Sequence, residues 1–585
     1  MPGTPVRRLS APWLCLLSIL AASVVWWPMF LRPFASGYGD WQFFHHMWEA
    51  ARISVLRHGE FPLWDPYHCG GITLWGNPQN QSLSPFFVLS FLTGTVLAQK
   101  VYVLLHAAAG FFGTFRLAER ETEVSAIPAA LVAFAWSASG FFIWHASGGH
   151  SAFVPFFLIP FVLLSFHRCL EDPRYVLAVA GLLVWMFLHG SVYPVPYAIV
   201  LLCFTALLEM IRRRSFRVII LRGAAIAAFT GLLSAIRVVP VIDELRRSPR
   251  AVALVDRVSP GEILDFLIVR SHPRPFPPHE YVWSEYGAFV GIGVVVLAMA
   301  GGVIAFLGGP GARHARRMSL GLIVFSGLML GNWGPWSPWA LLHQLPIYDS
   351  LRVPSRFRVF VVLYLALLAG IALQRIIDLA ERKLSSEGDP ARQLRTKRAI
   401  GLAGVIIVAF LAADIVHAAF PLVKRFHYAE VGRDSPAKRF HYTESPHDEY
   451  AQFPARNVGT SGCMEAMNFN VTNGLWRGDV PQVRIAGTTG EITSWARTNN
   501  TISASVWTDG PGELSFNQNA VPGWTANVGE QVTEATQLRL RVASGRHDVV
   551  WRYRPRSISL AIALTFVGVI ASAVFLYLAK RKSAS

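Results

Sequence analysis

Long apolar runs alternate with short polar loops along most of this 585-residue chain. About 20 apolar residues cross the hydrocarbon core of a bilayer as a helix, so apolar runs of roughly 18 or more are candidate spans. The sequence predicts about twelve such helices, near residues 12–31, 97–116, 125–145, 152–169, 174–190, 192–211, 218–241, 287–307, 317–332, 357–378, 399–420 and 557–579. The first run follows two arginines as a signal peptide would, but bulky residues end it, so we interpret it as a retained helix.

The loops between these runs differ in charge. Arginine and lysine gather in RLAERE, HRCLEDPR, IRRRSFR, GARHARRM, ERKLSSEGDPARQLRTKR and the final KRK, whereas the turns HASGGHS and HGSVYP carry neither. Cytoplasmic loops of membrane proteins are enriched in these two residues. The pattern therefore predicts a multi-pass protein of the cell (inner) membrane with both termini in the cytoplasm. Four larger segments would then lie outside, at 32–96, 242–286, 333–356 and 421–556.

The pattern changes its period in the last outer segment. TISASVWT, GELSFNQ, TQLRLRVA and HDVVWRYRP alternate polar with apolar residues and are separated by Gly, Pro and Asn turns. The sequence thus predicts a mainly α, polytopic membrane protein with a small extracytoplasmic β-sandwich-like domain near the C-terminus. Its parts would be a transmembrane domain at 1–420, the β domain at 421–556, and an anchor helix with a cytoplasmic tail at 557–585.

Composition supports this division between membrane and loops. Hydrophobic residues make up 53% of the chain and charged residues 15%, with a mean hydropathy of +0.38. So little charge could not cover a soluble protein of this size, so membrane lipids are expected to surround most of the chain. The net charge of +17 comes from basic loops at the helix ends, so no nucleic-acid partner is expected.

The five cysteines show no metal-type spacing. Only Cys69 and Cys463 fall in segments predicted to lie outside the membrane. We expect them to be two separate thiols, with a disulfide as the alternative.

The outer segment 32–96 is unusually rich in acidic, histidine and aromatic residues. No Pro or Gly occurs between Asp40 and His58, and this stretch predicts a helix lying along the membrane surface. Asp40 would start the helix, where a carboxylate is favoured by the free N–H groups. It is either a helix cap or a catalytic base at the membrane surface. His45 and Glu49 on the same helix are candidate substrate contacts.

The rest of this segment, GEFPLWDPYHCGGITLWGNPQNQSLSP, is rich in Pro and Gly and predicts a folded loop. Its candidate substrate-binding residues are Glu60, Trp64, Asp65, Asn77 and Gln79. Trp64 can stack on a sugar ring, and an interfacial aromatic belt is the alternative explanation for the aromatic residues.

Outer-face arginines supply a second candidate site. YDSLRVPSRFRVF places Arg352, Arg356 and Arg358 just before a predicted span, on the side opposite to the positive-inside pattern. A guanidinium binds phosphate through a planar fork. Arg352 and Arg356 are therefore candidate donor-phosphate ligands, while Arg358 falls where the helix starts. Contact with lipid headgroups or with a neighbouring carboxylate is the alternative.

Polar residues at other outer helix ends are expected to be structural. They are His150, His189, Tyr193, Glu285 and Tyr286.

GYGDWQFF, HGEFPLWDPYHCGG and GNPQNQSLSP resemble the first outer loop of bacterial YfhO-type membrane proteins, members of the GT-C class of integral-membrane glycosyltransferases. The resemblance continues in LPIYDSLRVPSRFRVF and in NAVPGWTANVGE…LRVASGRHDVVWRYRP. It implies a GT-C-like transmembrane domain and a sugar donor on a polyprenyl phosphate. It also implies that the acid early in the first outer loop, Asp40 here, acts as the base or positions the acceptor.

The acceptor could be a glycan, a lipid or a protein of the cell envelope. Relatives with a paired acidic motif use a divalent metal, but this chain has DWQ there, so no cofactor is expected and a metal is not indicated. A transporter or flippase of lipid-linked sugars and a non-catalytic envelope protein are the alternatives. Transporters tend to show internal repeats and charged or broken helices at mid-membrane depth, which this sequence does not display.

Overall fold

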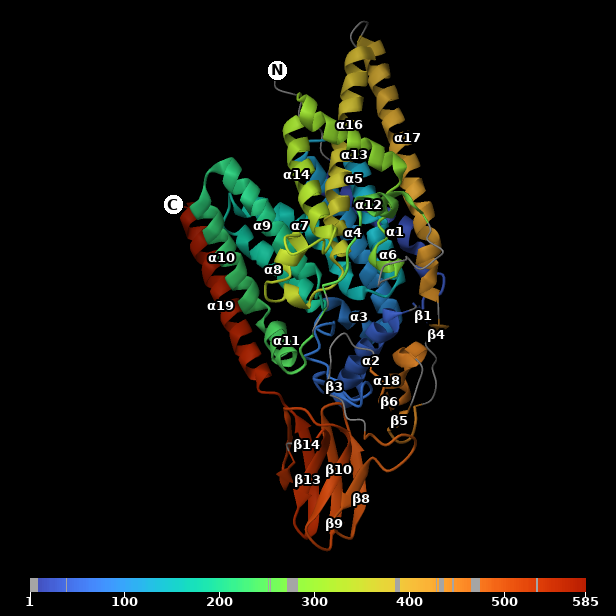
Figure 1. The fold of residues 1–585 in the computed structure, drawn as a ribbon, viewed down its shortest axis with the longest axis vertical. Coiled ribbons are helices and arrows are strands. Elements are labelled where there is room, and N and C mark those ends of the chain that lie inside the picture. Colours follow the sequence, from blue (N-terminus) through green and yellow to red (C-terminus); the bar gives the residue numbers. More distant parts are fainter. Residues whose placement is uncertain are drawn as a thin grey trace.

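The computed structural model describes residues 9–37, 39–250, 252, 254–270, 282–384, 390–427, 429–430, 436–443, 447–463, 474–532 and 535–584. Parts of three predicted loops, 242–286, 380–398 and 421–556, thus lie outside the described residues. The molecule is elongated, with a helical bundle at one end and a β domain at the other (Figure 1).

Helices form at all twelve predicted apolar runs. They are α1 (Ala11–Trp26), α4 (Thr95–Glu121), α5 (Ala126–Ser137) with α6 (Gly140–Ser147), the 3-10 helix η3 (Ser151–Leu158) with α7 (Ile159–Cys169), α8 (Tyr175–Leu188), α9 (Pro194–Arg213), α10 (Phe216–Leu233), α13 (Ile292–Leu307), α14 (Ala312–Met329), α16 (Arg358–Leu384), α17 (Pro390–Val423) and α19 (Ser557–Ala584).

Nine helices in the described part of the chain are long and apolar enough to cross a membrane. The predicted twelve also counted α8, which has 14 residues, and the pair α13 and α14, which are bent by 119° at their junction. The predicted run 218–241 is divided between α10 and α11 (Ala235–Arg247). The chain is an integral membrane protein with fewer long straight spans than its apolar runs suggested.

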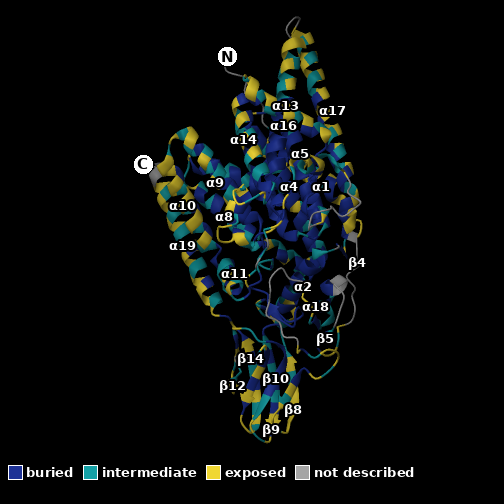
Figure 2. Ribbon diagram, viewed as in Figure 1, coloured by how far each residue is buried: buried dark blue, intermediate teal, exposed yellow. Residues whose placement is uncertain are grey.

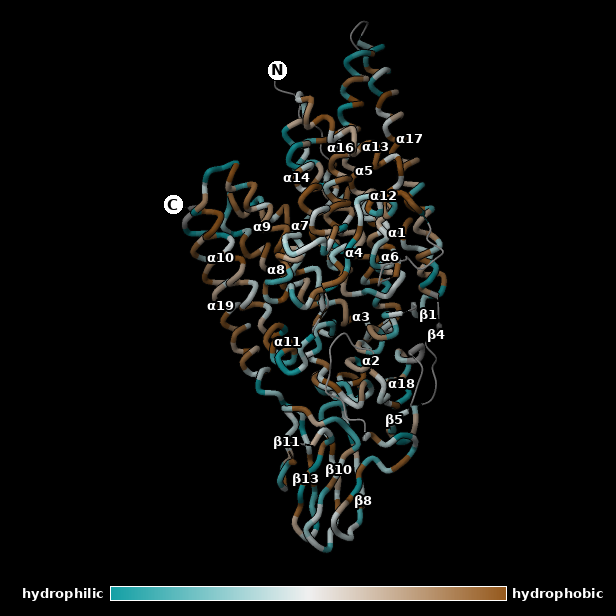
Figure 3. The backbone as a smooth tube through the Cα atoms, viewed as in Figure 1, coloured by the Kyte–Doolittle hydropathy of each residue, from teal (hydrophilic) through white to brown (hydrophobic). Residues whose placement is uncertain are grey.

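The most apolar helices differ greatly in burial. The span that contains α16 is 83% buried inside the protein, and α16 packs against α5, α13 and α14. The spans of α10, α17 and α19 are only 11–22% buried, and exposed residues run along their length (Figure 2). Their outward faces are apolar as well (Figure 3). Such faces suit hydrocarbon, where helices bond their own backbone and need no polar surface.

The two ends of the bundle differ as the charge pattern predicts. The tip between α16 and α17 and the C-terminal end of α19 lie far from the β domain, which sits at the opposite end beside α2 (Asp40–His58) and α11 (Figure 1). The described residues of the basic loop, 380–384 and 390–398, are thus at the opposite end of the molecule from the β domain.

Helix α2 has the predicted bounds, Asp40–His58, but it is not a surface helix. Most of its residues are buried, because the 3-10 helix η8 (His447–Gln452), α18 (Phe453–Arg456) and α4 pack around it. Its N-cap is Gly39, with φ 67°, and Asp40 is the first helical residue. The proposed capping role of Asp40 is therefore taken by glycine, which adopts this conformation without a steric cost.

Further short helices connect the outer side. They are η1 (Trp27–Phe30), η2 (Pro85–Val88), α3 (Leu89–Thr93), α12 (Pro260–Ile268), η4 (Trp283–Glu285), α15 (Pro338–Leu342), η5 (Tyr348–Ser350), η6 (Pro354–Phe357) and η7 (Lys424–His427). Two-residue strands pair β1 (Ala35–Ser36) with β4 (Ala429–Glu430) and β2 (Trp64–Asp65) with β3 (Ile72–Thr73).

Two four-stranded antiparallel sheets form the β domain. One has the order β12 (Glu530–Gln531), β13 (Gln537–Val542), β10 (Gly512–Asn519), β7 (Val483–Ala486), and the other β11 (Trp524–Ala526), β14 (Gly545–Tyr553), β9 (Thr501–Thr508), β8 (Gly490–Arg497). Alternate residues of β9, namely Ile502, Ala504 and Val506, point inward and share one core with Leu514 and Leu540 of the other sheet. Burial alternates along β9, β13 and β14 as their sequences predict, whereas six consecutive residues of β10 are buried.

Trp64 of the first outer segment completes this core. Its side chain is fully buried, and its ring centroid lies 5.3 Å from that of Trp524 and 4.8 Å from that of Tyr553. Next to it, the carboxylate of Glu60 accepts from the hydroxyl of Thr498 (2.7 Å). The β domain is therefore docked on the outer loop by a shared core.

A disulfide joins Cys69 to Cys463, with their Cα atoms 4.6 Å apart. The prediction of two separate thiols is wrong. The two residues are 394 positions apart, and no sequence spacing signals such a pair. They meet because strands β5 (His441–Thr443) and β6 (Val458–Thr460), which pair in parallel, lie against the outer loop, where Gly70 N–H donates to Thr460 O (2.8 Å).

A buried ion pair links the same three segments. His46 of α2 donates from Nε2 to the Asp65 carboxylate and from Nδ1 to the carbonyl of Tyr450, each over 2.8 Å. Both partners can only accept, so the imidazole carries two protons and a positive charge. Burial alone would lower the pKa of His46, but the charge and hydrogen bond of Asp65 raise it above its ordinary 6.5. Burial alone would raise the pKa of Asp65, but the pairing with His46 lowers it below its ordinary value.

This pair predicts a pH window for stability. Because the pKa of His46 is raised in the folded protein, its charge stabilises the fold below about pH 6.5, and this stability is lost as pH rises through the folded pKa. Because the pKa of Asp65 is lowered in the folded protein, its charge stabilises the fold above about pH 3.8, and this stability is lost as pH falls through the folded pKa. His46→Gln should lower the free energy of unfolding by about 3 kcal/mol within this window and flatten its pH dependence. Thermal unfolding between pH 3 and 9 measures both effects, with His547→Gln on strand β14 as the control. Equal pH profiles for His46→Gln and wild type would contradict the ion pair.

The membrane topology can be tested by thiol labelling of intact cells. In a variant whose Cys15, Cys169 and Cys203 are replaced by alanine, a cysteine at exposed Asp509 should react with an impermeant maleimide. A cysteine at exposed Arg392 should react only after the cells are permeabilised, because the charge pattern predicts that the basic loops lie in the cytoplasm. The reverse labelling pattern would show that the orientation is inverted.

Candidate active site

The turn after α6 lies directly on the first turn of α2. The backbone N–H of Asp40 donates to the carbonyl of Gly148 (3.3 Å), and the indole N–H of Trp41 donates to that of Ala146 (2.6 Å). Gly149 has φ 89°, and a Cβ there would collide with the backbone nitrogens of Asp40 and Trp41. The glycines of HASGGHS thus allow two backbones to touch, which holds the side chains of Asp40 and His150 near each other.

His150 stands between two carboxylates from different elements. Its Nε2 lies 3.8 Å from Oδ2 of Asp40 and 3.9 Å from Oε1 of Glu285 in η4. The Asp40 side chain is 42% exposed, whereas that of Glu285 is 5% exposed. Two acids that are 245 residues apart in the sequence therefore face one imidazole, and one of them is open to solvent.

Glu285 is neutralised by Arg356 of η6. The guanidinium binds the carboxylate through two nitrogens, one of them (Nε) 2.7 Å from Oε2. It also lies over the rings of Tyr193 (4.0 Å) and Phe153 (4.8 Å). Burial alone would raise the pKa of Glu285, but Arg356 and then His150 lower it to about 2. Glu285 is therefore a fixed anion and cannot serve as a proton acceptor near neutral pH.

The pKa of Tyr193 is also changed by these arginines. Burial opposes ionisation of its phenol, yet the pKa is lowered because the guanidinium of Arg356 and those of Arg250 and Arg352 favour the phenolate. The positive charge of the arginines thus extends over the ring that lies beside the cluster.

Arg358, the first residue of α16, ties the cluster to the backbone. It donates to the carbonyls of Glu285, Gly287 (3.1 Å) and Ser284 (2.9 Å), and its Nη2 donates to Nε2 of His145 (2.9 Å). The side chain is fully buried. Arg358 thereby fixes the loop that carries Glu285 and the ring of His145.

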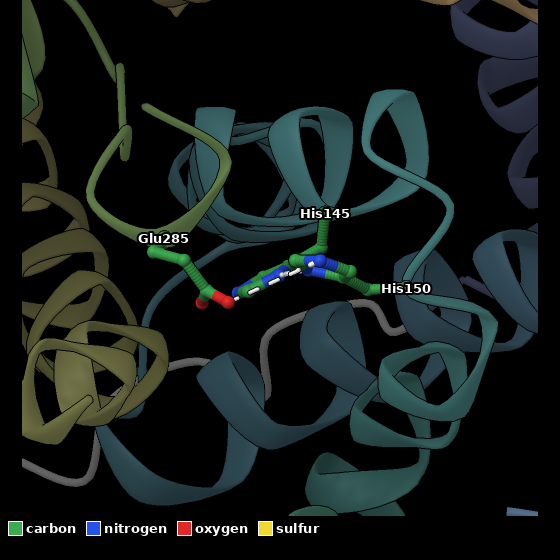
Figure 4. A group of neighbouring side chains, drawn as sticks. All are labelled: His145, His150 and Glu285. Atoms are coloured by element: carbon green, nitrogen blue, oxygen red, sulfur yellow. Dashed lines mark hydrogen bonds and ion pairs between the residues drawn. The ribbon is translucent and has the colours of Figure 1, made fainter. Parts of the chain in front are cut away.

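His145, His150 and Glu285 offer three ligand atoms within 4.8 Å of one another (Figure 4). Two imidazoles and a carboxylate are donors that zinc and manganese accept. Their arrangement, however, is that of a hydrogen-bonded chain, because Nδ1 of His145 lies 2.6 Å from Nδ1 of His150. Two nitrogens on one tetrahedral zinc ion lie more than about 3 Å apart, since each is about 2.0–2.1 Å from the metal. A metal would require the two rings to separate.

Asp40 is thus the carboxylate of this cluster that is open to a reactant. Glu285 is held by Arg356 and Arg358, and His150 is held by His145. An exposed acid at a fixed place beside cationic groups can accept a proton or orient a hydroxyl.

The predicted substrate-binding residues of the outer segment lie elsewhere. His45 is buried and stacked on Trp41, and burial lowers its pKa to about 3. Glu49 pairs with Arg52 on its own helix (2.8 Å). Asp65 is held by His46.

Contacts with neighbouring loops and with the β domain occupy the other four. Glu60 and Trp64 bind the β domain, as described above. Asn77 is buried, and its side-chain oxygen accepts from the backbone of Gln79 (2.9 Å). The carbonyl of Asn77 also accepts from Arg237 of α11. These four residues shape the outer loop in this structure and do not line the cluster around Asp40.

The two predicted phosphate ligands differ in exposure. Arg352 is exposed at the protein surface, and its backbone N–H lies 3.5 Å from the hydroxyl of Tyr193. Arg356 is 3% exposed, and its fork is engaged by Glu285, but its Nη1 is buried without a hydrogen-bond partner among the described residues.

The structure brings Asp40, Arg352 and Arg356 to one region, with groups that we expected to be structural or did not single out. Glu285, Tyr193 and His150 were expected to be structural, and His145 was not singled out. Arg358 was noted only as the residue where the predicted span begins. The signal in the sequence was the histidine pair of HASGGHS, in an outer turn without lysine or arginine.

No protein-family model matches the chain, and no curated protein matches it. Among solved structures, the chain is similar to the arabinofuranosyltransferase AftD from Mycobacteria, at 20% identity over 72% of this chain and with a TM-score of 0.44. It is also similar to the Archaeoglobus fulgidus oligosaccharyltransferase tethered with an acceptor peptide, at 12% identity over 78% of this chain and with a TM-score of 0.40. The chain spans 27% of the first protein and 64% of the second. Likeness at this level does not establish a shared fold.

Proposed function

We propose that the chain is a membrane glycosyltransferase that moves a sugar from a polyprenyl-phosphate donor to a cell-envelope acceptor at the outer face of the membrane. Asp40 is the base that takes the proton of the acceptor hydroxyl. The proposal follows the sequence resemblance to GT-C enzymes of the YfhO type and the geometry around Asp40.

One observation carries the proposal: Asp40 is the exposed acid of an otherwise buried ionic cluster at the outer end of the bundle. Its side chain is 42% exposed, while Glu285 and Arg356 are 5% and 3% exposed. A carboxylate near the membrane surface is within reach of a lipid-carried substrate and of a water-borne acceptor. Polar groups of a transporter would be expected nearer to mid-membrane depth.

The segment before η6 supports a role in binding the donor phosphate. Ile347 and Val353 both have positive φ, 78° and 61°, which is strained for β-branched residues. Such strain persists where surrounding contacts hold it, often at ligand sites. Here Tyr348 donates to the carbonyl of Pro196 (2.8 Å), and Val353 is buried. This strained segment holds Arg352 at the protein surface.

Departure of a polyprenyl phosphate requires positive charge near the leaving oxygen. Arg352 is exposed and has a fork suited to phosphate. Arg356 adds positive charge from its buried position beneath the surface, where its Nη1 has no hydrogen-bond partner in the described part of the chain. The base and the cations then lie on either side of the transferred sugar.

The central test is Asp40→Asn in purified protein with a lipid-linked sugar donor. The change keeps the shape of the side chain but removes its basicity, so turnover should fall by about 10²–10⁴-fold. Since Gly39 is the N-cap, stability should fall by less than about 1 kcal/mol, the contribution of a charge at a helix N-terminus. Turnover and thermal unfolding are measured on the same samples.

Glu49→Gln is the matched control for Asp40→Asn. It removes a carboxylate from the same helix, where Glu49 pairs with Arg52 away from the cluster. Its turnover should equal that of wild type. If Asp40→Asn also keeps normal turnover, Asp40 is not the base and the proposed reaction loses its main support.

Arg352→Ala should weaken use of the donor by about tenfold to a hundredfold, because a charge-assisted contact contributes about 1.5–3 kcal/mol. Arg352→Lys should recover only part, since the fork is lost. The measurement is kcat/KM for the lipid-linked sugar, with Arg546→Ala on the exposed face of β14 as the control. Equal kcat/KM for Arg352→Ala and Arg546→Ala would place the phosphate elsewhere.

A further inference from the structure

The hydrogen bonds at the cluster determine where the protons of His145 must be. A guanidinium can only donate, so Nη2 of Arg358, 2.9 Å from Nε2 of His145, makes that nitrogen an acceptor. A histidine whose Nε2 accepts is neutral and carries its proton on Nδ1. Arg358 is fully buried and is held by four backbone carbonyls as well, so it is fixed in this position.

The same reasoning then applies to His150. Nδ1 of His145 lies 2.6 Å from Nδ1 of His150, and only one proton fits between two nitrogens at this distance. His145 supplies that proton, so Nδ1 of His150 must accept it. His150 consequently carries its own proton on Nε2, the atom that faces Asp40 at 3.8 Å and Glu285 at 3.9 Å.

The geometry points to a proton-locked histidine pair in which Arg358, through His145, holds His150 as a permanent Nε2–H donor beside Asp40. His150 then cannot act as a base while the pair is intact, because Nδ1 is occupied and Nε2 is already protonated. Its two nearest carboxylates lie beyond hydrogen-bond distance, so Nε2–H is free to donate to an oxygen placed between them. We assign His150 as a positioning residue that binds a hydroxyl or phosphate oxygen of the reactants.

Charged groups from several elements surround His150. Asp40 of α2 and Glu285 of η4 face its Nε2. Arg356 of η6 is paired to Glu285, and Arg358 of α16 contacts His145. Phe153 stacks on His145 at 4.2 Å and is uncharged. The hydrogen bond from His145 is the contact that occupies Nδ1 of His150.

Nitrogen NMR of the full-length protein in lipid nanodiscs tests this directly. With ¹⁵N-labelled histidine, the signal of His150 is assigned by its loss in His150→Gln. In wild type at neutral pH, Nε2 of His150 should carry the proton and Nδ1 should carry none. A proton on Nδ1 of His150, alone or together with one on Nε2, would overturn the proposal.

Two substitutions of His145 distinguish the effect of its hydrogen bond to His150 from the effect of its packing. His145→Asn places an amide nitrogen, which can donate, at the position of Nδ1, so His150 should keep its proton on Nε2. His145→Leu offers no donor, so a form of His150 with a proton on Nδ1 should appear. Identical proton positions on His150 in the Asn and Leu variants would also overturn the proposal. If the Leu variant fails to fold, the wild-type measurement still decides.

A metal ion is the competing occupant of these ligand atoms. Addition of Zn²⁺ or Mn²⁺ at a few equivalents should leave the two histidine signals unchanged, because the shared proton occupies the site. A saturable shift or broadening of both signals would show that the pair is a metal site and would refute the lock.

The kinetic consequence rests on the proposed function, while the NMR result does not. His150→Gln keeps an N–H at the ε position and should retain most of the turnover, whereas His150→Asn keeps one only at the δ position and should lose about tenfold. The pH profile should be the same in both, since His150 is not the base. Equal activity of both variants beside an intact NMR lock would refute the positioning role. Loss of the lock, by contrast, would leave the test of Asp40 untouched.

Discussion

The buried ion pair between Glu285 and Arg356 is the contact on which the outer end of the bundle depends. Both groups are at most 5% exposed, and neither could stay charged there alone, because burying an unpaired ion costs several kcal/mol. The pair keeps Glu285 anionic and places Arg356 against the stacked rings of Phe153 and Tyr193. Arg358 then binds the same loop through its carbonyls and reaches His145. The protonation of the two histidines follows from this arrangement, and so does the isolation of Asp40 as the exposed acid.

A second set of contacts joins the beginning of the chain to its end. Trp64 lies in the core of the β domain, Cys69 is bonded to Cys463, and His46 bridges Asp65 and the backbone of Tyr450. These contacts enclose α2, which the apolar and aromatic residues alone suggested would lie on the membrane. Because α2 carries Asp40 at its start, the C-terminal domain contributes to the rigidity of the candidate site without supplying a reacting group.

Local patterns were sufficient to predict the elements but not the site. The bounds of α2 and the strand at 501–508 agree with the sequence prediction, since each depends on periodicity and on flanking Gly and Pro residues. The cluster depends on contacts between residues up to 245 positions apart, and Glu285 had no local feature that marked it. Some of the acids and aromatics of the first outer segment have structural contacts, since Glu60, Trp64 and Asp65 hold other segments in place. The disulfide was missed for the same reason, because two cysteines carry no information about the fold that brings them together.

The presence of two buried arginines, Arg356 and Arg358, indicates what the site requires. A bundle held by apolar packing has no need of charges at its outer end, and replacing a buried ion pair by apolar residues is often neutral or stabilising. What such a network supplies is a single arrangement, since every donor and acceptor must be matched. Here that arrangement fixes which nitrogen of each histidine carries a proton and which carboxylate remains free. A site that must take one proton from one hydroxyl at the membrane surface gains from this selectivity, because the exposed acid has no competing base within the cluster.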